Sequence, residues 1–413
     1  MPSHRERVSV HVADPRWRSD QPVGYLTYDR SRPPGTFSFA YTSQWIESRA
    51  AIAIDPRLPL VPSEIHFQAL PGAFADASPD RWGRILLDRR EQIEARARGR
   101  QPRTLNDWDY LLGVQDETRM GGLRLAGETG VFLADQRLGV PPLADVRRIQ
   151  QLADSFERGR PLPTADAEAW LATLVIPGSS LGGARPKATV RDVDGSLWIA
   201  KFPSHNDRHD VGAWEYVLNR LAASAGIAVP ESRLLSLASH HTFSARRFDR
   251  DGQGRRLYAS AMTLTGKTDR ASASYLDVAA ALEQYGNPAT LPDDLHQVFR
   301  RLVFNVSSAH RDDHLRNHGF VHDGVGWRPA PAFDLNPTPE QELHALALDD
   351  TSTVPSLATV RSTASLYRLS AAEATAVIEE VADALRSWRD VAARCGLNRQ
   401  EMDQMAPAFE LPK

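Results

Sequence analysis

The order in which two apolar patterns follow each other most constrains the fold of this chain. Up to about residue 270, apolar residues fall in short runs rich in β-branched and aromatic side chains and bounded by turn residues. From Tyr275 onward they recur mostly at helical spacing. The sequence therefore predicts an α+β protein in which a β-rich part precedes a helical part.

These patterns place the expected elements along the chain. Strands are expected at 8–12, 23–28, 36–41, 187–193, 196–202, 234–237 and 242–248, and helices at 79–99, 208–225, 275–285, 292–306 and 370–389. A chain of 413 residues favours two to three domains. Proline-containing segments at 139–145 and 158–166 mark plausible joints, so we expect domains at 1–140, 141–270 and 271–413.

Charge and cysteine content narrow the class of protein. Lys and Arg number 49 against 52 Asp and Glu, so no field of the whole molecule would draw it onto nucleic acid. The single cysteine, Cys395, excludes an internal disulfide and any Cys-x-x-Cys motif. The N-terminus lacks the apolar run of a signal peptide, and no apolar stretch is long enough to span a membrane. We therefore expect a soluble, cytoplasmic protein.

The strongest local signal is the segment His310-Arg-Asp-Asp-His-Leu-Arg-Asn317. It contains His-Arg-Asp followed by four residues and Asn, the catalytic-loop pattern of protein kinases. In that chemistry Asp312 would orient and accept the proton of an attacking hydroxyl, and Asn317 would offer an amide oxygen to Mg²⁺. One short match is weak evidence for a kinase. The interpretation therefore depends on whether the other residues of a kinase site occur in the expected order along the chain.

The other parts of a kinase occur in the expected order. Asp334 follows a predicted hairpin, where a second metal-binding carboxylate is expected. An apolar strand ends in Lys201, one of only four lysines, and resembles the strand whose amine holds ATP phosphates. Glu215 lies in a predicted helix that can return it to Lys201. The small-residue loop 178–187 precedes that strand, and its N–H groups could approach phosphates. Together these signals predict a kinase-like core.

With these residues in place, the sequence resembles the HipA-type bacterial serine/threonine kinases, the toxins of HipBA toxin–antitoxin modules. The matching stretches are 180–187, 199–203, Glu215 with 226–230, 247–250, Asp312-x-His314-x-x-Asn317 and 332–334, while 71–84 and 113–122 resemble the family's N-terminal subdomain. The resemblance implies a two-lobed kinase-like core, with a small β-rich lobe at 141–270 and a larger helical lobe at 271–413. An α+β subdomain at 1–140 would precede it.

The resemblance also implies a role for individual residues. Asp312 is expected to be the catalytic base, and His314 to shape the catalytic loop. ATP is expected to bind at Gly182, Gly183, Ala184, Arg185, Lys187, Lys201, Glu215, Asn317 and Asp334, and the last two are also expected to hold Mg²⁺. Ser180, or the adjacent Ser179, is expected to be autophosphorylated, which would silence the enzyme by placing negative charge where the phosphates of ATP must lie.

The biological role implied by the resemblance is that of a toxin. It would arrest growth and promote persistence by phosphorylating a translation component, such as an aminoacyl-tRNA synthetase. Family members bind a helix-turn-helix antitoxin. Because this sequence has no convincing helix-turn-helix pattern, we expect contact with DNA only through that partner.

Two other interpretations of the residues stay open. A metal hydrolase would use the patch of His310, Asp312, Asp313, His314, His318, His322 and Asp323, although no His-Glu-x-x-His pair stands out. A non-catalytic kinase fold could serve only to hold an antitoxin and corepress its operon, although a pure scaffold has no need of Lys201, Asp312, Asn317 and Asp334. His310 stands where the family usually has Asn, which leaves the hydrogen bonding of this loop open.

Overall fold

The structure is a computed structural model that describes residues 5–17, 21–31, 34–133, 139–159, 185–252, 254–268 and 272–412. The chain divides into two compact units, of which the first comprises Met1–Ala200 with Asp249–Ala259 and the second Lys201–Phe248 with Ser260–Lys413. Among the described residues, no helix is both long enough and apolar enough to cross a membrane.

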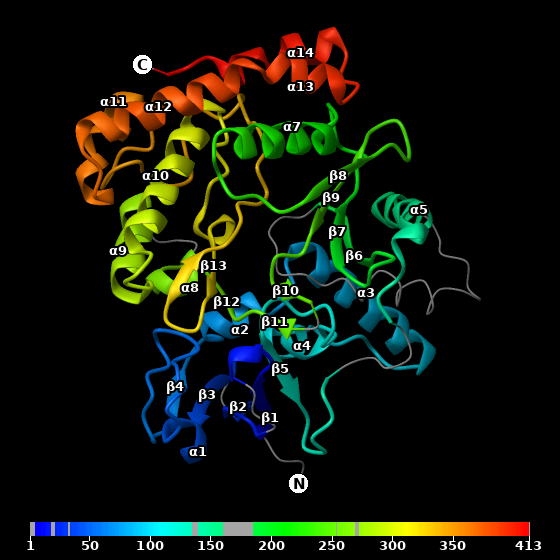
Figure 1. Ribbon diagram of the computed structural model, residues 1–413. Coiled ribbons are helices and arrows are strands. Elements are labelled where there is room, and N and C mark those ends of the chain that lie inside the picture. The colour runs from blue at the N-terminus through cyan, green and yellow to red at the C-terminus, as the bar shows by residue number, and fades with distance from the viewer. Residues whose placement is uncertain are drawn as a thin grey trace. The chain divides into compact units, whose positions relative to one another are not determined.

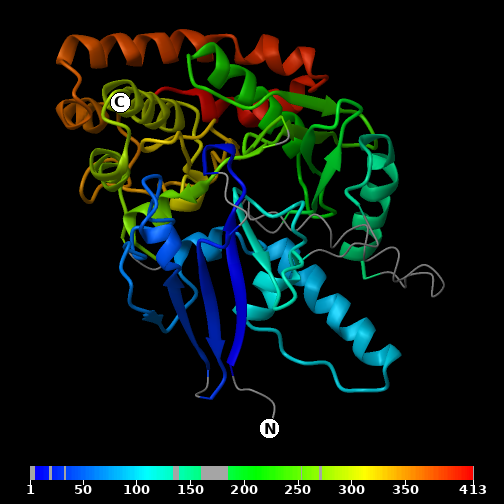
Figure 2. The same cartoon turned by 60° about the horizontal axis from the view of Figure 1, so that its bottom comes forward.

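An antiparallel sheet forms the first part of unit 1 (Figures 1 and 2). Its order is β4-β3-β2-β1-β5, from β1 (Arg5–Val12), β2 (Gly24–Asp29), β3 (Thr36–Tyr41), β4 (Ile65–Phe67) and β5 (Leu123–Ala126). Buried and partly exposed residues alternate along β2, as expected for a sheet with one covered face. Strands β1, β2 and β3 confirm the three strands expected near the N-terminus.

The helices of unit 1 are α1 (Ser43–Ile46), α2 (Gly72–Asp76), α3 (Arg81–Ala97), α4 (Asp107–Gly113) and α5 (Val146–Glu157). Helix α3 begins at Arg81, two residues after the expected start, because the side chain of Asp80 accepts a hydrogen bond from the main-chain N–H of Gly83 and so caps the first turn. After α5 come β6 (Lys187–Arg191) and its neighbour β7 (Leu197–Lys201), and later the short β10 (Arg250–Asp251), β11 (Gly254–Arg255) and β12 (Tyr258–Ser260).

Unit 2 is mostly helical. It contains α7 (Val211–Ser224), the antiparallel pair β8 (Ser232–Leu235) and β9 (Thr242–Arg246), α8 (Ala261–Thr265), α9 (Tyr275–Tyr285), α10 (Leu291–Ser307), the hairpin β13 (Gly319–His322) and β14 (Trp327–Pro329), α11 (Leu357–Ser362), α12 (Ala371–Arg386), α13 (Trp388–Arg394) and α14 (Arg399–Met405). Helix α10 lies against α9 and α12 (Figure 1). The helix expected at 370–389 is in fact two, because α12 ends at Arg386 and α13 starts at Trp388.

Helix α10 is the element that positions the site. It starts with Pro292 near its N-terminus and with Asp293 and Asp294 in its first turn, where carboxylates favour the helix dipole. Nearly all of its second half is buried, so its C-terminal end is held firmly within unit 2. The predicted catalytic loop follows directly from that end.

Candidate active site

The loop begins with a sharp turn after α10. Ala309 has a positive φ of 47°, and the N–H of His310 donates to the carbonyl of Asn305 at 3.0 Å. The left-handed backbone costs alanine roughly 1 kcal/mol. The N–H of Thr338 donates to the carbonyl of Ala309 at 2.9 Å and helps to hold this conformation. The turn directs residues 310–317 away from the helix axis.

Asp312 and Asn317 lie at the two ends of this loop. The side chain of Asp312 is 59% exposed, so its carboxylate can be reached by an incoming hydroxyl. The amide Nδ2 of the buried Asn317 donates to the main-chain carbonyl of Asp312 at 2.7 Å. Asn317 Oδ1 is buried and has no hydrogen-bond partner among the described residues. An unpaired amide oxygen is a hard ligand, and it therefore fits Mg²⁺.

Lys201 connects two carboxylates from distant parts of the sequence. Its Nζ lies 2.5 Å from Glu215 Oε1 on α7 and 2.5 Å from Asp334 Oδ1. Glu215 is buried, and the ammonium group of Lys201 stabilises its charge. Burial disfavours the ammonium, but the two carboxylates outweigh burial and raise the pKa of Lys201 above its ordinary value. Lys201 is therefore a fixed cation at neutral pH.

Asp334 is held in a special conformation after the β13–β14 hairpin. Its φ is 59°, in the left-handed region, where aspartate is tolerated better than most residues. Asn336 Nδ2 lies 3.4 Å from Asp334 Oδ1, the same oxygen that lies 2.5 Å from Lys201 Nζ. An irregular backbone held in this way is common at functional sites.

His310 joins the catalytic loop to the segment that carries Asp334. Its Nδ1 lies 2.9 Å from the carbonyl of Asn336 and 3.2 Å from the N–H of the same residue. Burial lowers the pKa of His310, so the ring is neutral, and either tautomer can bond to the main chain of Asn336. A histidine at this position thus supplies a definite hydrogen bond, which the sequence had left open.

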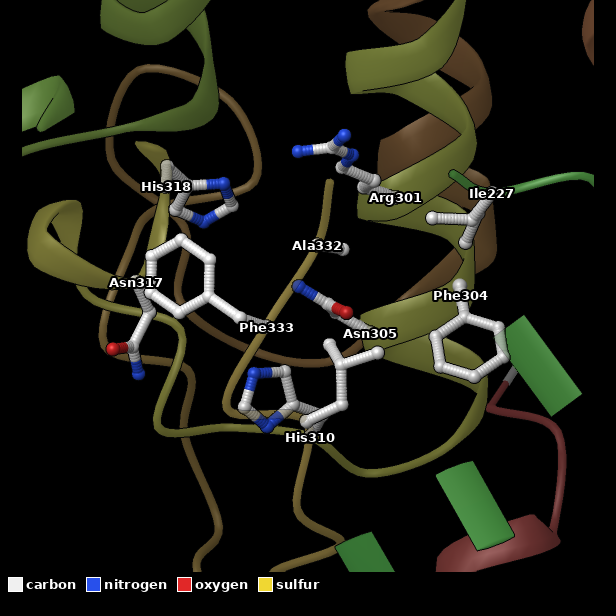
Figure 3. Close-up of a pocket in the computed structure, with 10 residues that line it drawn as sticks. Ile227, Arg301, Phe304, Asn305, His310, Asn317, His318, Ala332 and Phe333 are labelled. Atoms are coloured by element: carbon white, nitrogen blue, oxygen red, sulfur yellow. The ribbon is translucent and has the colours of Figure 1, made fainter. Parts of the chain in front are cut away.

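A narrow cavity is lined by residues of the catalytic loop, of the segment 332–335 and of helix α10 (Figure 3). In this view Asn317 and His318 lie on one side of Phe333, and the helix that carries Arg301, Phe304 and Asn305 lies on the other. The residues that line it are Ile227, Arg301, Phe304, Asn305, His310, Asn317, His318, Ala332, Phe333 and Leu335. The cavity is too small for a nucleotide, so we do not regard it as the ATP site. Its lining residues instead pack beneath the catalytic loop and the segment that carries Asp334.

The remaining predicted site residues are distributed as follows. Gly182, Gly183, Ala184, Ser179 and Ser180 lie outside the described residues. His314 Nε2 is 3.8 Å from Asp312 Oδ1, and its buried Nδ1 has no partner among the described residues.

Two predicted ATP ligands lie in unit 1: Lys187 is the first residue of β6, and Arg185 precedes it by two positions. Lys187 is 1% exposed, and its Nζ lies 2.5 Å from Asp80 Oδ2. Trp82 also donates its indole N–H to the main-chain carbonyl of Lys187 at 3.2 Å. In unit 1, therefore, Lys187 joins β6 to the start of α3.

The His and Asp patch does not form a metal cluster. Across the described ranges, no three His, Cys, Asp or Glu side chains converge as they would around a metal ion. His322 belongs to β13, and the buried Asp313 and His310 are hydrogen-bonded to the main chain of Ala345 and Asn336, outside the loop. The metal-hydrolase interpretation therefore loses its geometric basis in this part of the chain.

The sequence did not reveal the residues that stabilise the catalytic loop through hydrogen bonds to Asp313. Asp313 accepts hydrogen bonds from Tyr275 and His344, which come from segments far away in the sequence. The sequence predicts only that Tyr275 begins a helix, and His344 belongs to no recognised motif. No local pattern could have identified either, because their pairing depends on the fold.

Comparison with known proteins gives a consistent result. The family model described as HipA-like C-terminal domain matches residues 179–389, and the model described as HipA N-terminal domain matches residues 17–125. A relative from Sinorhizobium fredii (strain NBRC 101917 / NGR234), named "Putative kinase Y4mE", is 26% identical over 352 residues, covering 77% of this chain and 76% of the relative.

The similarity extends to a solved structure. HipA in the complex of HipA, HipB and operator DNA from the Shewanella oneidensis MR-1 toxin–antitoxin system has a TM-score of 0.68 and 17% sequence identity, covering 97% of this chain and 95% of that chain. At this identity the match concerns the fold, and it confirms the predicted kinase-like α+β class. Because the C-terminal family model alone spans half of the residues, the chain belongs to the HipA family.

Proposed function

We propose that this protein is a serine/threonine kinase that transfers the γ-phosphoryl group of ATP to a hydroxyl group of a target protein. The observation that carries the proposal is the position of Lys201 Nζ, 2.5 Å from both Glu215 Oε1 and Asp334 Oδ1. Protein kinases need a Lys–Glu ion pair and a metal-binding aspartate at the same place. The exposed Asp312 and the unpaired oxygen of Asn317 complete this set.

Each residue has one task in this proposal. Lys201 binds the phosphates of ATP, and Glu215 keeps its ammonium in place. Asn317 Oδ1 and the carboxylate of Asp334 hold Mg²⁺, which neutralises phosphate charge when it is bound. Asp312 orients the attacking hydroxyl and accepts its proton while the new oxygen–phosphorus bond forms and ADP leaves. Most of the rate would come from positioning and charge, as in other phosphoryl transfers.

Membership of the HipA family supports a proposal for the regulation and the partners of this protein. We propose that autophosphorylation at Ser180, or at Ser179, inhibits the enzyme. The fold match to HipA in a complex with HipB and operator DNA supports a DNA-binding antitoxin as partner, so that DNA is contacted indirectly. The protein would then act as a toxin, with a translation component such as an aminoacyl-tRNA synthetase as the class of target.

Mass measurement of the intact protein tests the kinase proposal. We would incubate the wild type with Mg-ATP beside Asp312→Asn, the Ser179/Ser180 alanine pair, and Asp293→Asn. The last variant makes the same chemical change at an exposed carboxylate in the first turn of α10, at the end of that helix remote from the loop. Added phosphate in the wild type and in Asp293→Asn, but in neither of the other two, supports both the kinase and its regulatory serine.

Other outcomes separate the alternatives. ATP binding without any mass change would leave the kinase claim to a screen of target proteins. If neither ATP nor Mg-ATP binds, the non-catalytic scaffold that holds the antitoxin is the better function. A large loss of stability in Asp312→Asn would be unexpected, because an exposed carboxylate contributes roughly 0.5 kcal/mol or less to folding.

A further inference from the structure

The two adjacent aspartates of the catalytic loop have opposite surroundings. The side chain of Asp312 is 59% exposed, whereas that of Asp313 is completely buried. A buried carboxylate is costly unless several donors satisfy it. The burial of Asp313, next to a residue that is exposed to solvent, therefore has to be compensated by hydrogen bonds to its carboxylate.

The Asp313 carboxylate accepts hydrogen bonds from two segments that lie far apart in the sequence, α9 and residues 344–345. The hydroxyl of Tyr275 on α9 donates to Oδ2 at 2.6 Å, and His344 Nδ1 donates to the same oxygen at 2.9 Å. The main-chain N–H of Ala345 donates to Oδ1 at 3.0 Å. Asn305 Nδ2 donates to the hydroxyl oxygen of Tyr275 at 2.7 Å, so the tyrosine proton is left to point at Asp313.

The main-chain carbonyls on both sides of Asp312 also accept hydrogen bonds. His318 Nε2 donates to the carbonyl of Asp313 at 3.2 Å. The N–H of Ala345 lies 3.0 Å from the carbonyl of Arg311. Asp312 thus stands between two anchored residues, while its own side chain has freedom to meet a substrate.

We infer that Asp313, Tyr275 and His344 are positioning residues that fix the backbone of Asp312 for phosphoryl transfer. This inference rests on the proposed kinase function and gives a role to three residues to which the kinase pattern assigns none. The charge states agree with it. Burial alone would raise the pKa of Asp313, but the bonds from His344 and Tyr275 keep it below its ordinary value. Burial and Asp313 together keep the pKa of Tyr275 well above its ordinary value, so it remains a donor.

The chain offers a matched pair of tyrosines for the test. Tyr275 and Tyr367 are both fully buried in unit 2. The hydroxyl of Tyr275 bonds to Asp313, whereas that of Tyr367 has no hydrogen-bond partner among the described residues. Tyr275→Phe and Tyr367→Phe therefore remove the same atom from two buried rings, and only one of them touches the loop.

We would measure the maximal rate of phosphate incorporation, the ATP concentration that gives half of that rate, and hydrogen exchange of residues 310–318. Tyr275→Phe should lower the maximal rate by roughly tenfold to 100-fold, because a small displacement of a catalytic group is that costly. The half-saturating ATP concentration should stay within about twofold, and exchange of the loop should accelerate. Tyr367→Phe should change none of these.

His344 provides a rescue experiment. Its Nε2 is buried without a partner among the described residues, so the Nδ1 bond is the polar contact that the ring supplies. His344→Asn can keep a donor near the Nδ1 position, whereas His344→Leu cannot. The asparagine variant should retain a larger share of the maximal rate than the leucine variant.

The outcomes separate this inference from the kinase proposal. Equal rates and equal exchange in the two Tyr→Phe variants overturn the positioning role. If the wild type transfers no phosphate, the kinase proposal fails, and hydrogen exchange alone decides the inference. Faster exchange at residues 310–318 in Tyr275→Phe alone then supports the anchor, and equal exchange in the two variants overturns it.

Discussion

The side-chain amide of Asn317 donates a hydrogen bond of 2.7 Å to the main-chain carbonyl of Asp312. This bond closes the catalytic loop and at the same time turns Oδ1 of the amide away from Asp312. One residue thus fixes the backbone of the expected base and presents the oxygen expected to hold Mg²⁺. The two roles can be separated by experiment because they affect different quantities.

Asn317→Ala should lower the rate of phosphoryl transfer by roughly 100-fold and raise the Mg²⁺ concentration needed for half of the maximal rate. The free energy of unfolding should fall by only about 1 kcal/mol, the usual contribution of one hydrogen bond. A Mg²⁺ titration of phosphate incorporation, beside urea unfolding, measures both. An unchanged Mg²⁺ requirement would remove Asn317 from the metal site.

The ion pair between Lys201 and Glu215 predicts that substitutions of these two residues have non-additive effects on the free energy of unfolding. Lys201→Met leaves the buried Glu215 without its cation and should cost about 3–5 kcal/mol. Adding Glu215→Gln should recover part of this loss, with a coupling energy of about 1–3 kcal/mol. Urea unfolding of the two single variants and the double variant gives the coupling. Strict additivity would mean that the ion pair is not formed in solution.

Local patterns were enough to predict the elements of the site that follow a motif. The strand ending in Lys201, the helix of Glu215 and the β13–β14 hairpin before Asp334 were all expected at these places, and the structure brings the three side chains together. The short strands near the N-terminus were also predictable, because β-branched and aromatic runs between turn residues are a local signal.

Long-range pairing was not predictable. The motif selects Asp312 as the base, but nothing in the sequence indicates that Asp312 is exposed and Asp313 buried, since burial depends on Tyr275 and His344. Lys187 follows a glycine-rich loop, which suggests a phosphate ligand, yet in unit 1 its ammonium meets Asp80, more than a hundred positions earlier. Such contacts are set by tertiary packing rather than by spacing.

The buried pair of Lys187 and Asp80 leads to a prediction for unit 1. Lys187→Met should destabilise this unit by about 3–5 kcal/mol, because Asp80, whose side chain is only 5% exposed, would lose the ammonium group that balances its charge. The double variant Lys187→Met/Asp80→Asn should be more stable than the single one, since asparagine can still cap α3 at Gly83. Urea unfolding tests the order of the three variants. If Lys187→Met lowers ATP affinity and leaves stability unchanged, the ammonium serves the nucleotide instead.

Buried histidines near the loop predict that acid weakens the fold. Burial lowers the pKa of His318 to about 4 and also lowers that of His310, compared with an ordinary value of 6.5. The unfolded chain therefore binds protons more readily than the folded one between about pH 6.5 and pH 4. Stability is complete above this window and is lost as the pH falls through it. From pH 7 to pH 5, His318 alone should lower the free energy of unfolding by on the order of 2 kcal/mol.

Urea unfolding at pH 7, 6 and 5 measures this slope for the wild type and for His318→Gln. The variant lacks the titrating ring, and its Nε2 can still donate toward the carbonyl of Asp313, to which His318 Nε2 donates at 3.2 Å. It should be less stable at pH 7, because the imidazole also packs edge-on against the Tyr275 ring. Its stability should nevertheless depend less steeply on pH. If both proteins lose stability equally between pH 7 and pH 5, another group carries the acid sensitivity.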